Sequence, residues 1–389
     1  MSSIGCSRLP FEIILIIAEH LWSITERDEN GDGLMARQRR MTNFCLVSHE
    51  WYTAGIALLY LCPELRAANS LDRFVDTVTQ SGDANHLNID FGSMIHVLKM
   101  GHLDHDIPDM LLERLLSRLQ SNLISFEAPP TPFGIEGLTT LSMCKNVEQL
   151  DLTLLTDKHR TEDCFTFPDL KQAISGLPNL VTVSLPLKMA IVDTDDSIGD
   201  WPASLRSIKI GGTLDPQVMR RFQWPSHPFK LTIRNCQNLR AATLEGILDN
   251  ENIHEYLVRL YITRSNTMMF QDAPTGILYK LRNLMHLRIP LDCTEDFFML
   301  PPPEPSMSIR VLELTEPYSG QVLKEFTQQL FQALNLNLCN VLALGMCELP
   351  NNLWNSQFSP ISTKLRRRVQ RSPPADLEGI ENCGLYAMD

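Results

Sequence analysis

The chain has 389 residues, a hydrophobic content of 44% and a formal net charge of −12 at pH 7. This length and apolar content allow a large core and more than one domain, whereas the acidic balance argues against nucleic acids and anionic membranes as partners, because both attract basic surfaces. The longest apolar run without charge, residues 51–63, is shorter than the ~20 residues of a membrane-spanning helix, so no span is expected.

The ten cysteines are scattered singly, without close pairs. This usage is typical of a reducing compartment, where buried thiols act as small apolar side chains. The first residues are not typical of a signal peptide, because Glu12 interrupts the apolar start and no basic leader precedes it. We therefore expect a cytoplasmic and/or nuclear protein.

Residues 9–65 contain two apolar segments with helical periodicity, separated by polar residues at 22–41. Pro10 suits a first helical turn, and a second helix is predicted to begin at Thr42 or Asn43, both good N-caps. The expected face of the first helix consists of Ile13, Ile16, Ile17, His20 and Leu21.

Within this stretch lie a Leu-Pro pair, an acidic residue followed by Ile, a helix ending in Leu, a Leu-Val-Ser segment with Trp shortly after it, and a Leu-Tyr pair. These residues are Leu9, Pro10, Glu12, Ile13, Ile16, Leu21, Leu46, Val47, Ser48, Trp51, Leu59 and Tyr60. The pattern closely resembles the F-box of fungal F-box proteins, with a longer connection between the two halves. The resemblance predicts an F-box domain of three helices at residues 1–66, with a polar insertion at 22–41.

The resemblance implies that this domain docks on a Skp-family adaptor, which joins it to a cullin scaffold and to ubiquitin transfer. The expected adaptor-binding residues are Leu9, Pro10, Ile13, Ile16, Leu46, Val47, Trp51 and Leu59. A second interpretation treats the same helices as a cap for the following domain, without adaptor binding.

The insertion contains a partial match to a calcium-binding EF-hand loop, beginning at Asp28. The twelfth position, which should supply a bidentate Glu, is Arg39. We therefore predict a solvated insertion and no calcium site.

A repeated pattern follows, in which an apolar residue recurs three positions and then two positions further on. The middle residues of the ten copies are Leu98, Ile124, Leu150, Val183, Ile208, Leu231, Leu260, Leu287, Leu312 and Leu342. Their mean spacing of about 27 residues lies within the range of leucine-rich repeats. The predicted fold is thus α/β: a leucine-rich-repeat solenoid of horseshoe shape over residues 67–350, with parallel strands on its concave face. A doubly wound domain is the alternative, and it is disfavoured because no glycine-rich phosphate loop follows the first strand.

The first repeat is predicted to begin inside the F-box, with a strand at residues 59–65, a helix at 69–79 and the next strand at 95–100. Residues 351–389 are polar and contain a basic cluster. A nuclear-import signal is one interpretation of that cluster, and a solvated, frayed C-terminal tail is the preferred one.

No phosphate-binding loop, nucleophile elbow or paired-cysteine zinc motif is found. The best metal-like cluster is a polar connection made of His102, Asp104, His105, Asp106 and Asp109. It lacks a second half elsewhere in the chain, so we expect no metal, no cofactor and no enzymatic activity.

Outward strand positions of the repeats centred on residues 208, 231, 260 and 287 are rich in Lys and Arg, and none is acidic. Because neighbouring strands lie ~4.8 Å apart, these charges can hold one phosphate or acidic side chain together. The predicted substrate-binding residues are Lys209, Lys230, Arg234, Arg259, Tyr261 and Arg288. Ordinary polar strand positions are the alternative interpretation.

Taken together, these features predict a substrate-recognition subunit of an SCF-type (Skp-cullin-F-box) ubiquitin ligase that does not itself catalyse a reaction. Its expected partners are the Skp-family adaptor, the cullin scaffold and an acidic or phosphorylated target protein. The alternative is a leucine-rich-repeat scaffold that takes no part in ubiquitination.

Overall fold

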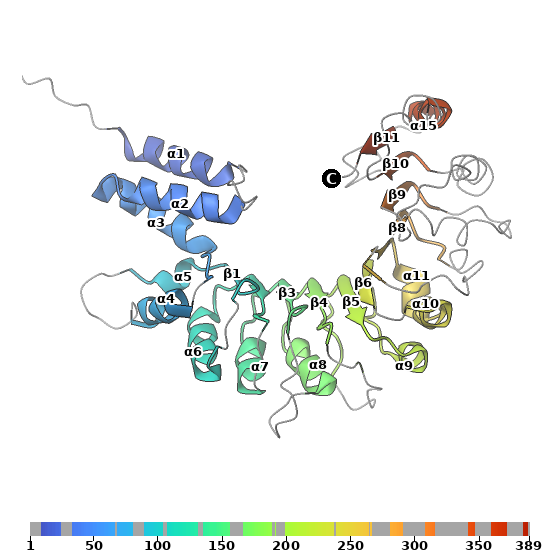
Figure 1. Cartoon of the computed structure of the whole chain (residues 1–389), viewed down its shortest axis with the longest axis horizontal. Coiled ribbons are helices and arrows are strands. Elements are labelled where there is room, and N and C mark those ends of the chain that lie inside the picture. Colours follow the sequence, from blue (N-terminus) through green and yellow to red (C-terminus); the bar gives the residue numbers. More distant parts are fainter. Residues whose placement is uncertain are drawn as a thin grey trace, which may run out of the picture. The chain divides into compact units, whose positions relative to one another are not determined.

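The computed structural model describes residues 9–24, 33–66, 68–80, 89–103, 107–130, 135–155, 166–188, 191, 199–236, 239–263, 265–266, 281–290, 308–315, 341–346, 359–371 and 384–387. The chain divides into two compact units, Met1–Phe165 with Ala173–Leu180 and Thr166–Gln172 with Val181–Asp389. Both units combine helices with parallel strands, so the fold is mixed α/β (Figure 1).

The first unit opens with three helices that pack on one another: α1 (Phe11–Ser23), α2 (Gly33–Cys45) and α3 (His49–Leu61). All three contribute apolar side chains to one buried cluster, which stabilises the arrangement by removing them from water. The members of this cluster are Ile14, Ala18, Met41, Phe44, Cys45 and Ala54.

The prediction that a helix begins at Thr42 or Asn43 is wrong, because both residues lie near the end of α2. The N-cap of α3 is Ser48, whose Oγ accepts the N–H of Trp51 at 3.4 Å. The expectation of a solvated insertion is also wrong for residues 33–41. They form most of α2, where Met41 is fully buried.

Polar residues of α2 make specific contacts that their sequence does not reveal. Arg37 lies over the ring of Trp22 at 4.9 Å, and Arg40 donates a hydrogen bond of 2.7 Å to the Ile24 carbonyl. Arg39, the residue that argued against a calcium loop, is part of this helix, while Asp28 lies outside the described residues.

The apolar face predicted for α1 is not the face that the structure buries. Ile14 and Ala18 are buried, whereas Ile13 and Ile16 are exposed. Residues 13–17 are all apolar, so several helical faces fit the spacing equally well and only the packing decides between them.

Further along the first unit, helices alternate with short strands. These elements are α4 (Ala68–Gln80), α5 (Phe91–Met94), β1 (Val97–Lys99), α6 (Asp109–Leu119), β2 (Ser125–Glu127), α7 (Ile135–Ser142) and β3 (Gln149–Asp151). Helix α8 (Phe167–Ser175) spans the boundary between the units. The strands β1, β2 and β3 pair in parallel.

A strand at residues 59–65 is not formed, because α3 continues to Leu61. The backbone joins the sheet all the same: Glu64 forms a parallel bridge with Lys99, and the His96 N–H donates to the Leu61 carbonyl at 3.1 Å. The predicted helix at residues 69–79 is confirmed by α4, and the predicted strand at 95–100 contains β1.

The second unit continues the same alternation. Its elements are β4 (Thr182–Ser184), β5 (Ser207–Gly212), α9 (Pro216–Arg221), β6 (Lys230–Cys236), α10 (Ala241–Leu248), α11 (Glu251–Tyr256), β7 (Arg259–Ile262), β8 (His286–Pro290), β9 (Val311–Thr315), β10 (Ala343–Met346), α15 (Ser359–Arg371) and β11 (Gly384–Ala387). Strands β4 to β11 pair in sequence order and in parallel. Helices α9, α10 and α11 lie against one face of this sheet (Figure 1).

Each of strands β1 to β10 places one fully buried apolar residue at its centre, and these residues are aligned within each unit. In the first unit they are Leu98, Phe126 and Leu150, and in the second they are Val183, Ile208, Leu231, Leu260, Leu287, Leu312 and Leu344. Eight of the ten predicted middle residues are therefore correct. The other two, Ile124 and Leu342, lie two positions before the observed centres Phe126 and Leu344, and Ile124 is only half-buried.

The backbone repeats one contact from strand to strand. The carbonyl of His96 accepts the N–H groups of Ile124 and Ser125, at 2.8 and 3.0 Å. The equivalent carbonyl of Arg206 accepts Phe229 and Lys230, at 2.8 and 2.9 Å. This regularity is compatible with a solenoid, and the horseshoe curvature and the predicted domain boundaries remain predictions.

Asparagines four residues before the central residue add a second repeated contact. The Nδ2 atoms of Asn146, Asn179 and Asn283 donate to carbonyls of the preceding repeat at 2.6, 3.0 and 2.6 Å. Each bond satisfies a backbone carbonyl that the parallel ladder does not reach.

The prediction of a frayed tail after residue 350 is wrong for two segments, α15 and β11. Helix α15 buries Ile361 and Leu365, and Arg368 donates a hydrogen bond of 2.9 Å to the Val341 carbonyl. Strand β11 pairs with β10. The apolar residues of α15 are few and surrounded by arginines, which is why composition alone indicates a solvated segment.

The placement of Phe126 at the centre of β2 can be tested by two single substitutions to alanine, one in β2 and one just before it. Phe126→Ala should lower the free energy of unfolding by about 3–5 kcal/mol, because it opens a cavity beneath a fully buried ring. Ile124→Ala should cost only about 1–2 kcal/mol, since Ile124 is half-buried. Urea denaturation of both variants measures the difference, and equal losses would contradict the placement of Phe126 at the centre.

Candidate functional site

The three-helix cluster exposes large apolar side chains that its own core does not use. Leu46 and Val47, in the turn between α2 and α3, are 77% and 60% exposed, and Ile16 on α1 is 59% exposed. Further exposed apolar residues on or beside α1 are Leu9, Phe11, Ile13 and Leu15. Apolar exposure concentrated in one small subdomain is typical of a binding surface.

The eight predicted adaptor-binding residues divide into two groups. Leu9, Ile13, Ile16, Leu46 and Val47 are exposed apolar residues, and the exposed Pro10 begins α1 by accepting the N–H groups of residues 13 and 14. Trp51 and Leu59 are half-buried and pack on the core cluster, with the Trp51 ring 4.7 Å from that of Phe44. Trp51 and Leu59 therefore pack against the core of the three-helix cluster and are only partly accessible to a partner.

Sequence reasoning missed Phe11 and Leu15, which are also exposed. The signal was present, because the apolar residues of α1 are too numerous for one buried face. A helix that is apolar nearly all round must contact something on more than one side.

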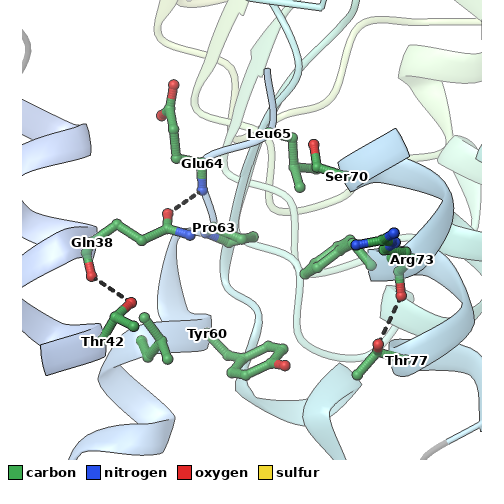
Figure 2. A pocket seen from close by; sticks show the side chains of 11 residues that line it. Gln38, Thr42, Tyr60, Pro63, Glu64, Leu65, Ser70, Arg73 and Thr77 are labelled. Carbon is green, nitrogen blue, oxygen red and sulfur yellow. Dashed lines mark hydrogen bonds between the residues drawn. The ribbon is translucent and has the colours of Figure 1, made fainter. Parts of the chain in front are cut away.

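A cleft of about 560 Å³ lies beside the cluster, between α2, the end of α3 and α4 (Figure 2). Tyr60 forms part of its wall and stacks on Phe91 with 4.5 Å between ring centroids. The Gln38 Oε1 atom accepts the backbone N–H of Glu64 at 2.6 Å across one side of the cleft (Figure 2). This hydrogen bond fixes the segment that joins the helices to the first strand.

In the second unit, the sheet face that α9, α10 and α11 do not cover carries polar side chains in two rows. Strand register aligns the first row as Ser207, Lys230, Arg259 and His286. It aligns the second row as Ser184, Lys209, Thr232, Tyr261, Arg288 and Glu313. Five of the six predicted substrate-binding residues thus lie side by side on strands β5 to β8.

Tyr261 is the centre of this group. The Lys230 Nζ atom lies 4.4 Å and the Arg288 Cζ atom 5.5 Å from its ring centroid. Its hydroxyl lies 3.2 Å from the Nδ1 atom of His286. The aromatic ring therefore separates two cations and attracts both through its quadrupole.

The sixth predicted residue, Arg234, lies further along β6, where it pairs with Gly211 of β5. A Cβ atom at Gly211 would collide with the Arg234 carbonyl. The glycine thus permits a close approach of the two backbones at this end of the sheet.

The two rows of polar side chains are not uniformly basic, because the next strand, β9, contributes Glu313 to the second row. Its Oε2 atom lies 2.8 Å from Arg288 Nε and 3.0 Å from His286 Nε2, and the side chain is only 12% exposed. These contacts have the geometry of ion pairs more than of aligned hydrogen bonds. The carboxylate was missed because the four repeats considered end one strand before it.

Burial lowers the pKa of Lys230, and the charges of Arg259, Lys209 and Arg288 lower it further, while Glu313 acts in the opposite direction. Burial also raises the pKa of the Tyr261 hydroxyl, followed by the effect of Glu313. The cations are therefore close enough to repel one another, and a single carboxylate does not compensate them.

Within the described ranges, no group of three His, Cys, Asp or Glu residues is arranged to hold a metal ion. Of the metal-like cluster in the sequence, His102 and Asp109 are described, while residues 104–106 lie outside the described residues. In the same part of the chain, no helix has both the length and the apolar character needed to cross a membrane.

No protein-family model matches the chain. It is similar to F-box protein YDR306C of Saccharomyces cerevisiae, with 24% identity over 300 residues that cover 75% of this chain and 59% of the relative. It is also similar to Protein pof5 of Schizosaccharomyces pombe, with 23% identity over 321 residues that cover 81% of this chain and 82% of the relative. The chain thus spans 59% of the length of the budding-yeast relative. These similarities support a fungal F-box protein.

The same comparison favours an adaptor over a catalytic protein, since the name of the budding-yeast relative denotes a binding module. This name agrees with the motif at residues 9–60. The exposure of Leu46 and Val47 is a separate observation that points in the same direction.

The pKa of Lys230 gives a test of charge crowding on the polar face. Its pKa is lowered in the folded chain, so the folded state loses this proton before the unfolded state does. Stability should consequently rise with pH between the lowered value and the ordinary value of 10.5. Thermal melts of the wild type and of Lys230→Met at increasing pH measure this effect. The wild type should gain stability relative to the variant, and a constant difference would show that Lys230 is not crowded.

Proposed function

We propose that this chain is the substrate-recognition subunit of an SCF-type ubiquitin ligase, which binds a Skp-family adaptor through α1 to α3 and a target protein through the strands that follow. The exposed apolar side chains of the three-helix cluster carry the proposal. The cluster has a complete core without them, and water contact with them is unfavourable unless a partner covers them. The name of the budding-yeast relative, an F-box protein, supports a Skp-family adaptor as the class of partner.

In this proposal, Leu46 and Val47 are the anchors of the adaptor contact. Both project from a short turn held by the Ser48 cap and by the packing of Phe44 beneath it. Their positions are therefore fixed before binding, and little conformational entropy is lost when a partner covers them. Complete burial of such side chains contributes about 1.5–3 kcal/mol each.

Catalysis would be carried out by the partners, including the cullin scaffold and the ubiquitin carrier that it holds. This chain would raise the local concentration of a target lysine near the carrier. The polar face with Lys209, Lys230, Arg259, Tyr261 and Arg288 is the proposed contact for an acidic or phosphorylated target.

A cytoplasmic and/or nuclear location belongs to the same proposal. The described cysteines Cys45, Cys62, Cys144 and Cys236 are buried thiols. Burial raises the pKa of the Cys144 thiol to about 11 and that of Cys236 to about 12, so neither is a reactive thiolate. This is the usage expected in a reducing compartment.

The adaptor contact can be tested with the double variant Leu46→Glu, Val47→Glu in a binding assay with a purified fungal Skp protein. The substitutions place charges on an apolar interface and should weaken binding at least ~30-fold, which corresponds to ~2 kcal/mol. Because both side chains are exposed, the thermal stability of the chain should not change. Calorimetric titration gives the affinity, and a melting curve gives the stability.

A matched control is Met110→Glu on α6, which places a charge on another exposed apolar residue, 74% exposed, of the same unit. It should bind the Skp protein with the wild-type affinity. If the wild-type chain binds no Skp protein, the proposal fails, and a repeat scaffold outside ubiquitination becomes the better interpretation. Equal losses in the control and in the double variant would show that α1 to α3 are not the specific contact.

A further inference from the structure

The cleft between α2, the end of α3 and α4 has the size and the lining of a small-molecule site (Figure 2). Its volume of about 560 Å³ lies within the range of roughly 300–1,000 Å³ that ligand pockets occupy. Its apolar walls are Leu59, Pro63, Leu65 and Phe74. All of its lining residues belong to the first unit. Apart from Leu59, none of them is among the residues proposed to contact the adaptor or the target.

Three polar side chains of this cleft have hydrogen-bond donors that no described residue uses. They are the Nε2 group of Gln38, the hydroxyl of Tyr60 and the guanidinium of Arg73. In Figure 2, the Gln38 nitrogen and the Tyr60 hydroxyl point into the space between the helices, and the Arg73 nitrogens lie on the α4 side. The donors therefore come from three different helices, α2, α3 and α4, and border one space.

Other polar groups of the cleft already have protein partners. The Gln38 Oε1 atom accepts the N–H of Glu64 at 2.6 Å. The Glu64 side chain is 2% exposed, and its carboxylate pairs with Arg66 at 2.7 Å and points out of the cleft (Figure 2). The hydroxyls of Thr42 and Thr77 donate to backbone carbonyls of their own helices, at 2.9 and 2.7 Å. The unused groups are thus mainly donors, and a ligand has to supply acceptors.

The charge at the cleft favours an anion. Among the described residues that line it, Arg73 carries the one positive charge, and its side chain is exposed. Asp76, one turn further along α4, pairs with Arg114 at 3.6 Å. Burial raises the pKa of the Tyr60 hydroxyl, followed by the effect of Tyr52, so this hydroxyl keeps its proton and donates at neutral pH. An incoming anion therefore meets one cation and two neutral donors.

A carboxylate fits these donors better than a phosphate does. It has a single charge and two oxygens, which one guanidinium can bind through two parallel N–H···O bonds. A phosphate monoester carries about −1.5 to −2 charges at pH 7, so one cation would leave part of its charge uncompensated.

The aromatic wall of the cleft indicates the shape of the rest of the ligand. The rings of Tyr60 and Phe74 are nearly parallel, with an interplanar angle of 17° and 6.3 Å between their centroids. Tyr60 also stacks on Phe91, which fixes the orientation of its ring. A flat apolar group can lie against such a wall and be removed from water.

We propose that this cleft binds a small organic acid with one carboxylate and a flat apolar body. Arg73 pairs with the carboxylate, and Tyr60 and Gln38 donate to its oxygens. The bound molecule contacts α2, α3 and α4 at once, so it stabilises the junction between the three helices and the first strand. This ligand site goes beyond the proposed recruitment of an adaptor and does not depend on it.

The test measures the binding of 2-naphthoate and 2-naphthamide to the full purified chain by saturation-transfer NMR titration. The two probes share one flat ring system, and only 2-naphthoate is charged at pH 7. It should bind at least ~10-fold more tightly, because hydrogen bonds to a charged group are roughly twice as strong as neutral ones. Saturation with 2-naphthoate should also raise the melting temperature, since the ligand binds the folded chain.

Variants of the three donors test the contacts one by one. Arg73→Gln should weaken the binding of 2-naphthoate ~10-fold and leave that of 2-naphthamide within about twofold. Tyr60→Phe keeps the ring and should weaken 2-naphthoate ~5-fold. Gln38→Glu keeps an oxygen that accepts the Glu64 N–H but adds a negative charge, so it should weaken 2-naphthoate at least ~10-fold.

A matched control is Arg39→Gln, which removes an exposed arginine next to Gln38 on α2 but outside the lining of the cleft. It should bind both probes with the wild-type affinity. Melting curves without a probe show whether each variant is folded. Because Arg39 and Arg73 are both exposed, their substitution should leave the stability of the free chain unchanged.

Four results would overturn the proposal. If 2-naphthoate does not bind saturably, or binds no more tightly than 2-naphthamide, the cleft does not recognise a carboxylate. An equal loss in Arg39→Gln would indicate general charge attraction. Tighter binding of inorganic phosphate would assign the donors to a different ligand, and displacement of 2-naphthoate by a purified fungal Skp protein would make the cleft part of the adaptor contact. The titrations contain no adaptor, so their failure is distinguishable from failure of the Skp assay.

Discussion

The fold depends on a pair of hydrogen bonds that recurs within both units: one carbonyl, two residues before the centre of a strand, accepts two successive N–H groups of the next strand. The acceptors are His96 and Ile124 in the first unit and Val181, Arg206, Phe229, Val258, Met285 and Arg310 in the second. Because this contact sets the register, the buried centre of each strand stacks on the centre of the previous one. The same contact begins in the three-helix cluster, where Leu61 accepts from His96. Pro63 thus takes the position that corresponds to a strand centre, although only the isolated bridge from Glu64 to Lys99 forms there.

A fixed register also determines what the uncovered face presents. Since side chains alternate along a strand, burial of each central residue forces its two neighbours outward and aligns them with their counterparts. The register places Lys230 directly beside Arg259, and Tyr261 directly beside Arg288. The repulsion between the cations is therefore imposed by the same hydrogen bonds that hold the sheet, and only a change of residue type can relieve it.

Much of this arrangement could be predicted from the amino-acid sequence, and the errors have identifiable physical causes. The spacing of apolar residues found eight of the ten strand centres, but it placed the centres Phe126 and Leu344 two positions early, because Ile124 and Leu342 are apolar as well. The spacing also left the buried residues Ile14 and Ala18 out of the apolar face predicted for α1, because residues 13–17 are all apolar. Helix α2 was missed because its buried face is narrow, with Met41 and Phe44 among charged residues. Glu313 was missed because the counting of charges stopped before β9, and a long connection separates this strand from β8.

The exposed apolar surface must stay accessible to a partner, whereas the segment around Glu64 that joins the three helices to β1 must be rigid. We call this segment the joint. Leu46 and Val47 must stay accessible, so they contribute little to the stability of the cluster, which rests on Phe44, Met41 and Ile14 beneath them. The joint must instead be rigid, and it is held by the hydrogen bond from Glu64 to Gln38 and by the bridge from Glu64 to Lys99. Both contacts use the backbone of Glu64, which links α2 to β1 through one residue. A partner bound at the turn would consequently be held in a fixed orientation to the first strands, without the loss of effective concentration that a flexible tether causes.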